Sequence, residues 1–414
     1  MIKINYSSKA MTVDGIWFAL LVVYIVMGYF AQDVLLPSSI SSLSLYTFLG
    51  FSLLAIIYSR RIKLSPIITW EILCLILAFI AMLYSPSFSI LGGTYYALIV
   101  NAILVFIFSQ MPWTKERFNL VMKAYAFSGA GLIIALALTG NLQDSSDSGR
   151  LGQELMGNAN ILATMLMVSA IYVLWLIVSS KAIYARLLYV GVLITIYIGM
   201  FLSGGRKYII VPLIFIYVLL ICKQNERGRK HTVRYTLLIF VLFVALYQLV
   251  MKVPALYDTI GYRFEGAFAL FDDSYEMDGS TLNRKMMIEA GFKGWLERPI
   301  FGHGFDSFKY YNAAEVTGNM YYSHNNFIEL LYNQGVVGFI AYYGMYLYLL
   351  IKAFKSNAQS INKGFVYGLI ASFMFYEYFA ISYSVTPSQL MVFFALCICR
   401  DTQQSNSLVE QGEK

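Results

Sequence analysis

Apolar segments of about 20 residues recur along the whole chain, and this pattern most limits how the chain can fold. A segment of that length crosses the hydrocarbon core of a bilayer as one α-helix. A membrane β-barrel would instead show alternating segments of about ten residues, and the sequence has none. The charged fraction is 13%, about half that of ordinary soluble domains. The sequence therefore predicts an all-α polytopic membrane protein.

The apolar segments predict about 12 transmembrane helices and one long, partly helical extracytoplasmic loop. The first segment is too long for a cleavable signal peptide, so we expect it to be retained. We expect nine transmembrane helices in 1–251, a loop and re-entry helix in 252–335, three transmembrane helices in 336–400 and a cytoplasmic tail in 401–414. The helices are expected at about 13–31, 40–58, 67–84, 94–111, 118–140, 159–179, 184–203, 208–222, 235–251, 336–354, 365–383 and 388–399.

Lysine and arginine residues gather in every second connection, which is the bias that cytoplasmic loops carry. This alternation predicts that both termini are cytoplasmic and that the loop at 252–335 lies outside. Arg150 and the pair Arg206-Lys207 depart from it on the outer side. The connections taken as cytoplasmic contain Arg60, Arg61, Lys63, Lys115, Arg117, Lys181, Arg186, Lys223, Arg227, Arg229, Lys230, Arg234, Lys352, Lys355 and Lys363.

The net charge of +7 then reflects mainly these cytoplasmic residues, and no nucleic-acid partner is expected. Four cysteines lie within or at the ends of apolar segments, where we expect them to pack as small buried side chains. They are Cys74, Cys222, Cys397 and Cys399. None falls in the long loop, and no Cys/His spacing suits a metal ion, so no metal site is expected.

The short turn Ser203-Gly204-Gly205-Arg206 joins the seventh and eighth predicted helices. Its glycines allow a sharp bend and a close approach to a ligand. The turn places the Arg206 guanidinium at a helix N-terminus, where the helix dipole also favours an anion. Guanidinium matches phosphate in bidentate geometry, so the turn indicates a phosphate site. The alternative is a basic residue that merely departs from the topology rule.

A second polar segment precedes the sixth predicted helix and contains Arg150, Asn158 and Asn160. Either asparagine could simply cap that helix. In the alternative that gives this segment a function, Arg150 reaches the same external site as Arg206.

The long loop divides into an acidic half and a helical half. The acidic half is expected to be a solvated connection, and its residues are Asp272, Asp273, Glu276 and Asp278. From Thr281 the spacing predicts a helix that carries Arg284 and that Pro299 ends. The turn around His303 lies between two glycines, which indicates a backbone requirement that His303 could merely accompany.

The segment Tyr322-Ser323-His324-Asn325-Asn326 opens the last helical region, with Ser323 as the expected N-cap. A histidine at a helix start near the membrane surface can accept a proton near neutral pH. Glu329 follows in the next turn, and an ionisable group at that depth is costly unless it is used or paired. The alternative for His324 is a structural hydrogen bond at the interface.

Together these motifs resemble the O-antigen ligase and polymerase superfamily, the Wzy/WaaL-like membrane glycosyltransferases. The resemblance covers about residues 150–354 in motif and the whole chain in its number of predicted helices. It is carried by Leu202-Ser203-Gly204-Gly205-Arg206, by Arg284 with Pro299-Ile300-Phe301-Gly302-His303-Gly304, by Ser323-His324-Asn325-Asn326-Phe327-Ile328-Glu329-Leu330-Leu331 with Gly335-Val336-Val337-Gly338, and by Arg150 with Gly157-Asn158-Ala159-Asn160-Ile161-Leu162-Ala163.

The resemblance implies a metal-independent, inverting glycosyltransferase without a cofactor, in the bacterial inner membrane with its site facing outward. It implies en bloc transfer of an oligosaccharide from undecaprenyl diphosphate to a hydroxyl of a glycan acceptor. By motif position, Arg206 and Arg284 would hold the diphosphate and His324 would be the catalytic base. A chain-length regulator and a flippase are further expected partners. The expected substrate-binding residues are Arg150, Asn158, Asn160, Lys207, His303, Asn325, Asn326 and Glu329.

The residue chemistry agrees with that assignment. Charge develops on a diphosphate leaving group as the glycosyl bond breaks, and two guanidiniums would stabilise it. His324 would take the proton of the acceptor hydroxyl. Apolar, aromatic-rich helices could hold the lipid chain of the donor.

Two activities share this donor and differ in their acceptor. We favour a repeat-unit polymerase (Wzy) for O-antigen, capsule or exopolysaccharide, because the segments around Arg206 and His324 are more similar to such enzymes. The alternative is an O-antigen ligase that transfers the glycan to lipid A core. From other classes, a secondary transporter would place ionisable residues at the midplane and show internal repeats, and a scaffold of the export machinery would need no site. The predicted helices contain few ionisable residues, among them Glu71, Lys123 and Glu377.

Overall fold

The structure is a computed structural model, and it describes residues 12–31, 33, 35–59, 62–86, 88–90, 93–142, 150–225, 229–254, 257–261, 265 and 279–412. Two groups of predictions fall on other residues. The basic side chains of Arg60, Arg61 and Arg227 and the acidic segment at 272–278 lie outside the described part of the chain.

Regular structure in the described residues is entirely helical, which confirms the predicted all-α fold. Every predicted transmembrane segment falls on a helix. These helices are α1 (Val13–Phe30), α2 (Ser38–Ser59), α3 (Pro66–Met82), α4 (Gly93–Gln110), α5 (Lys115–Leu138), α6 (Ala159–Ser179), α7 (Ile183–Leu202), α8 (Arg206–Asn225), α9 (Arg229–Lys252), α14 (Asn326–Lys355), α15 (Ser360–Tyr378) and α16 (Thr386–Gly412). Between α9 and α14 lie η1 (Tyr257–Gly261), α12 (Gly279–Glu297), α13 (Phe308–Tyr311) and η2 (Asn312–Val316).

The long helices suit a multi-pass membrane protein. Within the described residues, seven helices are long and apolar enough to cross a bilayer: α1, α2, α4, α5, α6, α7 and α14. Two further apolar stretches, Pro66–Met82 and Thr386–Cys399, are shorter. None of the four cysteines, all of them in the described residues, forms a disulfide; Cys399 is buried as expected, whereas Cys74, Cys222 and Cys397 are only partly buried.

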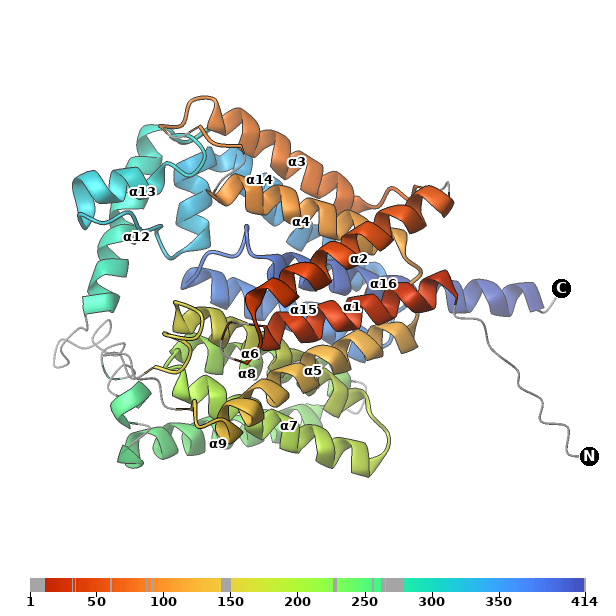
Figure 1. The fold of residues 1–414 in the computed structure, drawn as a ribbon. Helices are drawn as coiled ribbons and strands as arrows, with labels where there is room; N and C mark the ends of the chain where they lie inside the picture. Colours follow the sequence, from red (N-terminus) through yellow and green to blue (C-terminus); the bar gives the residue numbers. More distant parts are fainter. Residues whose placement is uncertain are drawn as a thin grey trace, which may run out of the picture.

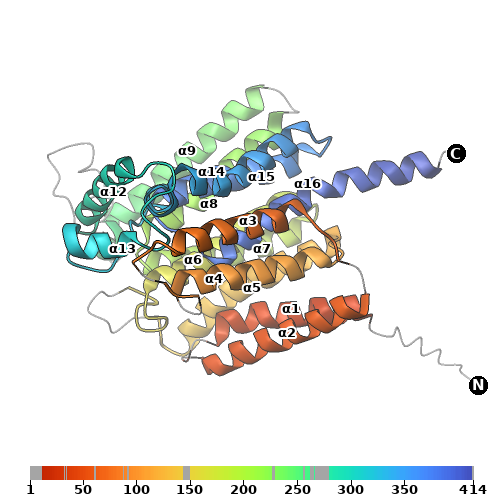
Figure 2. The same cartoon turned by 90° about the horizontal axis from the view of Figure 1, so that it is seen from above.

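The bundle has two distinct ends. In Figure 1, α12 and α13 lie together at one end, and α12 runs across the direction of the long helices. At the opposite end α1 begins and α16 ends, and Figure 2 shows the same separation from above. α12 and α13 therefore lie at one end of the bundle, away from the start of α1 and the end of α16.

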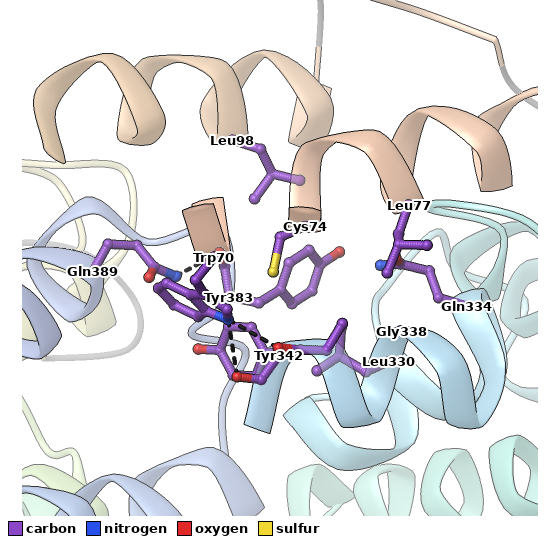
Figure 3. Close-up of a pocket in the computed structure, with 11 residues that line it drawn as sticks. Trp70, Cys74, Leu77, Leu98, Leu330, Gln334, Gly338, Tyr342, Tyr383 and Gln389 are labelled. Atoms are coloured by element: carbon purple, nitrogen blue, oxygen red, sulfur yellow. Dashed lines mark hydrogen bonds between the residues drawn. The ribbon is translucent and has the colours of Figure 1, made fainter. Parts of the chain in front are cut away.

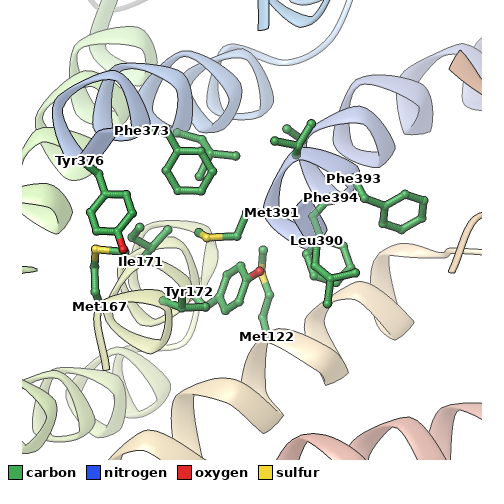
Figure 4. Packing of buried hydrophobic residues seen from close by; sticks show 14 of the residues in the cluster. Met122, Met167, Ile171, Tyr172, Phe373, Tyr376, Leu390, Met391, Phe393 and Phe394 are labelled. Carbon is green, nitrogen blue, oxygen red and sulfur yellow. The ribbon is translucent and has the colours of Figure 1, made fainter. Parts of the chain in front are cut away.

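The core lies where α5, α6, α15 and α16 meet (Figure 4). Tyr172 of α6 packs against Phe394 of α16, with ring centroids 6.1 Å apart. α15 also lies very close to α8, because a Cβ on Gly368 would come within 2.9 Å of the Phe215 carbonyl oxygen. The close contact fixes α15 relative to α8, whose first turn carries Arg206 and Lys207.

α14 is broken at Gly335. The φ of 64° and ψ of −165° there lie in a region that only glycine adopts readily. The segment at 299–304 closes the break from outside the helix. The amides of Val336 and Val337 donate to the carbonyls of Pro299 and Ile300, at 2.9 and 3.2 Å. Backbone groups that the break would leave without partners are thus satisfied.

The same segment also bonds to the last residues before the break. The amides of His303 and Gly304 donate to the carbonyls of Tyr332 and Asn333, at 2.8 and 3.0 Å. Gly302 has a φ of 72°, and a Cβ there would lie 2.6 Å from the Asn333 backbone. The predicted backbone requirement of this glycine-rich turn is therefore confirmed, and its reason is close contact with α14.

Gly335→Ala should destabilise the protein strongly. The new Cβ would collide with the backbone of Ile300, and the strained conformation alone costs about 1–3 kcal/mol. Gly344→Ala is the matched control, because Gly344 lies in the same helix with no atom near its Cβ position. This control should be neutral or stabilising by up to about 1 kcal/mol. Thermal unfolding in detergent measures both, and equal midpoints for the two variants would contradict this account of the break.

Candidate functional site

The turn between α7 and α8 is built as the glycines predicted. Gly204 has a φ of 67°, and α8 begins at Arg206, so the guanidinium of Arg206 is carried on the first turn of a helix. Arg150 reaches this turn from the preceding connection. Its Nε donates to the Ser203 carbonyl at 2.8 Å, and the Leu151 amide donates to Leu202 at 3.0 Å. The structure thus brings the two outer basic segments together.

The two asparagines before α6 have different contacts. Asn158 is the N-cap of α6, and its Oδ1 accepts from the Asn160 amide at 2.9 Å. Asn160 presents its own Oδ1 to Nη2 of Arg150 at 3.3 Å. Asn158 therefore caps the helix, whereas the side chain of Asn160 orients the Arg150 guanidinium.

Arg206 faces the start of α12. Its Nη2 donates to Oγ1 of Thr281 at 3.3 Å, and Thr281 is buried. Arg284 follows Thr281 by three residues on the same helix, so it lies one turn along the face that Arg206 contacts. Sequence reasoning missed Thr281, whose only signal is that spacing from Arg284.

Lys207 lies beside these arginines. The charges of Arg284 and Arg150 both reach it. Its Nζ donates to the Phe379 carbonyl at 2.8 Å and lies over the rings of Tyr208 and Tyr376, 5.0 and 5.3 Å from their centroids. Four basic side chains from three separate segments therefore gather at this end of the bundle.

His324 completes the cluster. Burial, then the charges of Arg284 and Lys207, lower the pKa of its imidazole to about 4. The ring is therefore neutral near pH 7 and free to accept a proton. Its backbone has a φ of 53°, a left-handed conformation uncommon outside glycine and often found at functional sites.

The prediction that Ser323 caps the helix after His324 is wrong. The N-cap is Asn325, whose Oδ1 accepts from the amides of Phe327 and Ile328 at 3.0 and 3.1 Å. The Ser323 hydroxyl instead donates to the Asn325 carbonyl at 2.8 Å. Asparagine and serine cap helices about equally well, so the left-handed turn at His324 decides which residue occupies the cap.

The buried carboxylate of Glu329 binds the segment that carries His324. Its two carboxylate oxygens accept from the Ser323 amide at 2.8 Å and from Nδ2 of Asn333 at 3.0 Å, and the residue is 1% exposed. Asn333 in turn accepts from the amides of Ser307 and Phe308 at the start of α13. The expected substrate contact of Glu329 stays a prediction, since the structure gives both oxygens protein partners.

His303 lies against α12 and α14. Its ring stacks on Tyr332 with centroids 4.5 Å apart, and its Nε2 is 2.7 Å from the Gly294 carbonyl. These contacts match the structural alternative for His303, and its role toward a substrate remains a prediction.

A small cavity lies elsewhere, between α3, α4, α14 and α16 (Figure 3). Its wall is largely apolar and includes Trp70, Leu98 and Leu330, together with the polar side chains of Tyr342 and Gln389. None of the expected catalytic residues lines it. The candidate site is the cationic cluster and not this cavity.

The geometry can support one kind of chemistry particularly well. Guanidinium groups concentrated at one place favour a ligand with several phosphate oxygens. A neutral imidazole within electrostatic range of those groups can remove a proton from a hydroxyl beside such a ligand. In the described part of the chain, no group of three His, Cys, Asp or Glu side chains is placed to hold a metal ion.

Comparison with known proteins gives one family. The family model described as O-antigen ligase matches residues 190–343. The match includes Arg206, Lys207, Arg284, His303 and His324, and it ends within α14, eight residues past the break at Gly335. A search of curated proteins finds no match.

The imidazole of His324 should titrate near pH 4, and Arg284→Met should raise this pKa by removing one of the two charges that lower it. Lys293→Met is the control, because Lys293 is exposed on the same helix. Labelled-histidine NMR measures the titration. Because the unfolded imidazole titrates near 6.5, the unfolded chain binds more protons between about pH 4 and 6.5, and stability should fall as pH drops through that window. A midpoint near 6.5 in the folded protein would contradict the proposed environment of His324.

Proposed function

The chain belongs to the O-antigen ligase/polymerase superfamily, and we propose that it polymerises oligosaccharide repeat units carried on undecaprenyl diphosphate. The products would be O-antigen, capsule or exopolysaccharide. The donor glycan would be transferred en bloc to a hydroxyl of a second lipid-linked glycan.

The observation that carries this proposal is that Arg206, Arg284 and His324 belong to one cluster although the chain separates them widely. Arg206 bonds to Thr281, one turn before Arg284, and the charge of Arg284 reaches His324. In the proposed reaction the two arginines bind the diphosphate and His324 faces the acceptor hydroxyl. Arg150 supports the turn that carries Arg206, since it bonds to the Ser203 carbonyl.

The proposed reaction is a single displacement at the anomeric carbon. The acceptor oxygen forms the new glycosidic bond while the bond to the diphosphate oxygen breaks on the opposite face, so the anomeric configuration inverts. His324 takes the hydroxyl proton, and the electron pair of the broken bond leaves on the lipid diphosphate. Arg206 and Arg284 stabilise that negative charge as it develops. The mechanism assigns no role to a metal ion or a cofactor.

We place this reaction at the outer face of the bacterial inner membrane. The site lies near the end of the bundle that carries α12 and α13, away from the cytoplasmic ends expected for the chain termini. The lipid chain of the donor would lie along the apolar helices, within reach of the bilayer. A flippase that supplies the donor and a chain-length regulator are the proposed partners.

An O-antigen ligase is the second candidate, because the matching family model carries that description. Donor, arginines and base would be the same, and the acceptor would be lipid A core. The cluster of cations and His324 supports both activities equally, so the acceptor must be tested directly.

Arg206→Ala, Arg284→Ala and His324→Ala should each abolish long glycan while the protein remains in the membrane. Loss of the base should slow transfer by about 10²–10⁴-fold, and loss of one arginine by about 10²–10³-fold. Arg→Lys should also fail at either position, because an ammonium cannot make the bidentate contact. Glycan ladders from cells that carry each variant measure the effect.

Lys293→Ala is the control for these variants, because it removes a cation from the exposed face of α12. It should give normal ladders. Normal ladders from all three site variants would reject the assignment of the catalytic residues.

The purified protein should join defined undecaprenyl-diphosphate oligosaccharides into longer chains on the lipid, and EDTA should leave the rate unchanged. Mass spectrometry reads product length and linkage. Transfer to lipid A core, with no growth of the lipid-linked glycan, would favour the ligase. Loss of activity in EDTA that magnesium restores would contradict the metal-free mechanism.

A further inference from the structure

The turn between α15 and α16 is held by side chains from the candidate site. Four of its backbone groups have such partners: the carbonyls of Tyr378 and Phe379 and the amides of Ser382 and Tyr383. The turn therefore lies at the junction of two site segments that are far apart in the sequence. We call residues 378–383 the junction turn.

One contact comes from the arginine side of the site. Lys207, which directly follows Arg206 in the chain, donates from its Nζ to the Phe379 carbonyl at 2.8 Å. Because the contact is at the start of α8, the position of the junction turn determines where the first turn of α8 lies.

The other contacts come from the histidine side. Asn325 Nδ2 donates to the Tyr378 carbonyl at 3.2 Å. Asn326 Oδ1 accepts from the amides of Ser382 and Tyr383 at 2.9 and 3.1 Å. These two asparagines directly follow His324, so the junction turn also fixes the backbone that carries the imidazole.

Glu377 anchors the junction turn from within the bundle. It is fully buried, and its Oε1 accepts from the hydroxyls of Tyr346 at 2.7 Å, Tyr342 at 3.3 Å and Ser382. The bond to Ser382 closes the junction turn on the end of α15, and the tyrosines tie it to α14. A buried carboxylate among membrane helices is costly unless it is used, and the proposed reaction does not use it.

The far side of the junction turn is fixed by α16. Gln389 Nε2 donates to the Tyr383 carbonyl at 2.8 Å. Tyr342, Tyr383 and Gln389 also line the cavity of Figure 3. The bond from Gln389 therefore holds the turn on the side that faces this cavity.

We propose that Glu377 is a positioning residue, which through Ser382 and the junction turn holds His324 in register with Arg206. Its effect on turnover rests on the proposed function, whereas its effect on the position of His324 does not. A misplacement of about 1 Å can cost an enzyme about 10²-fold in rate. Glu377 would therefore act on the site without contacting substrate.

The test compares two buried serines in the full-length protein. Ser382→Ala removes the hydroxyl that bonds to Glu377. Ser372→Ala is the control, because Ser372 is equally buried on α15 but bonds to the Val211 carbonyl of α8. Labelled-histidine NMR reports the ring environment of His324, and His324→Ala identifies its signal. Initial rates with a lipid-linked oligosaccharide give kcat and KM for the donor.

Ser382→Ala should move the His324 signal and lower kcat by about 10–10²-fold, with donor KM changed less than about threefold. Ser372→Ala should leave the His324 signal, kcat and the donor KM unchanged. Glu377→Gln, which keeps an acceptor oxygen, should lose less than Glu377→Ala, and such rescue separates hydrogen bonding from general loss of packing. If a Glu377 variant fails to fold, the serine pair still decides the question.

An unmoved His324 signal in folded Ser382→Ala would overturn the positioning role, whatever the activity. A moved signal in a protein whose His324→Ala variant is still active would instead refute the proposed function and leave the positioning role standing.

Discussion

The break in α14 is the constraint on which the end of the bundle that carries α12 and α13 depends. A helix that stops and restarts at membrane depth leaves amides and carbonyls without partners, and each of these is costly where water is scarce. Here the segment at 299–304 supplies those partners on both sides of Gly335. The first half of α14 can then lie apart from the second, with His324 at its start. The glycine-rich motif therefore serves the backbone, because Gly302 and Gly335 lie where a Cβ would collide with neighbouring main chain.

Side-chain amides and carboxylates also supply hydrogen-bond partners for backbone groups in this region. Asn325 and Asn326 bind backbone groups of the junction turn, and Glu329 and Asn333 connect the His324 segment to α13. None of these contacts is long or exposed. Together they hold a histidine with a left-handed backbone in one position, because the backbone groups on both sides of it are bonded to buried side chains.

Local patterns in the sequence predicted the local parts of the structure. Apolar periodicity located the helices, and the glycines before Arg206 and around His303 predicted turns that the φ angles confirm. Contacts across long separations were not readable in this way. Ser323 and Asn325 are both good caps, and the left-handed backbone at His324, which the sequence does not reveal, decides between them. Glu377 was visible as an ionisable residue in an apolar helix, but its partners on α14 and its link to the site depend on tertiary packing.

The electrostatics of the cluster has a consequence for the proposed reaction. Burial and the charges of Arg284 and Lys207 keep His324 neutral but also make it a weak base. A bound diphosphate would offset those positive charges, and the proton affinity of the imidazole would rise. The base would thus gain strength when the donor is in place, which is when a hydroxyl proton must be removed. In the proposed reaction, the arginines that bind the leaving group and the histidine that takes the proton would therefore be electrostatically coupled. The contacts that hold α8, α12 and α14 at one end of the bundle bring these residues together although they lie far apart in the chain.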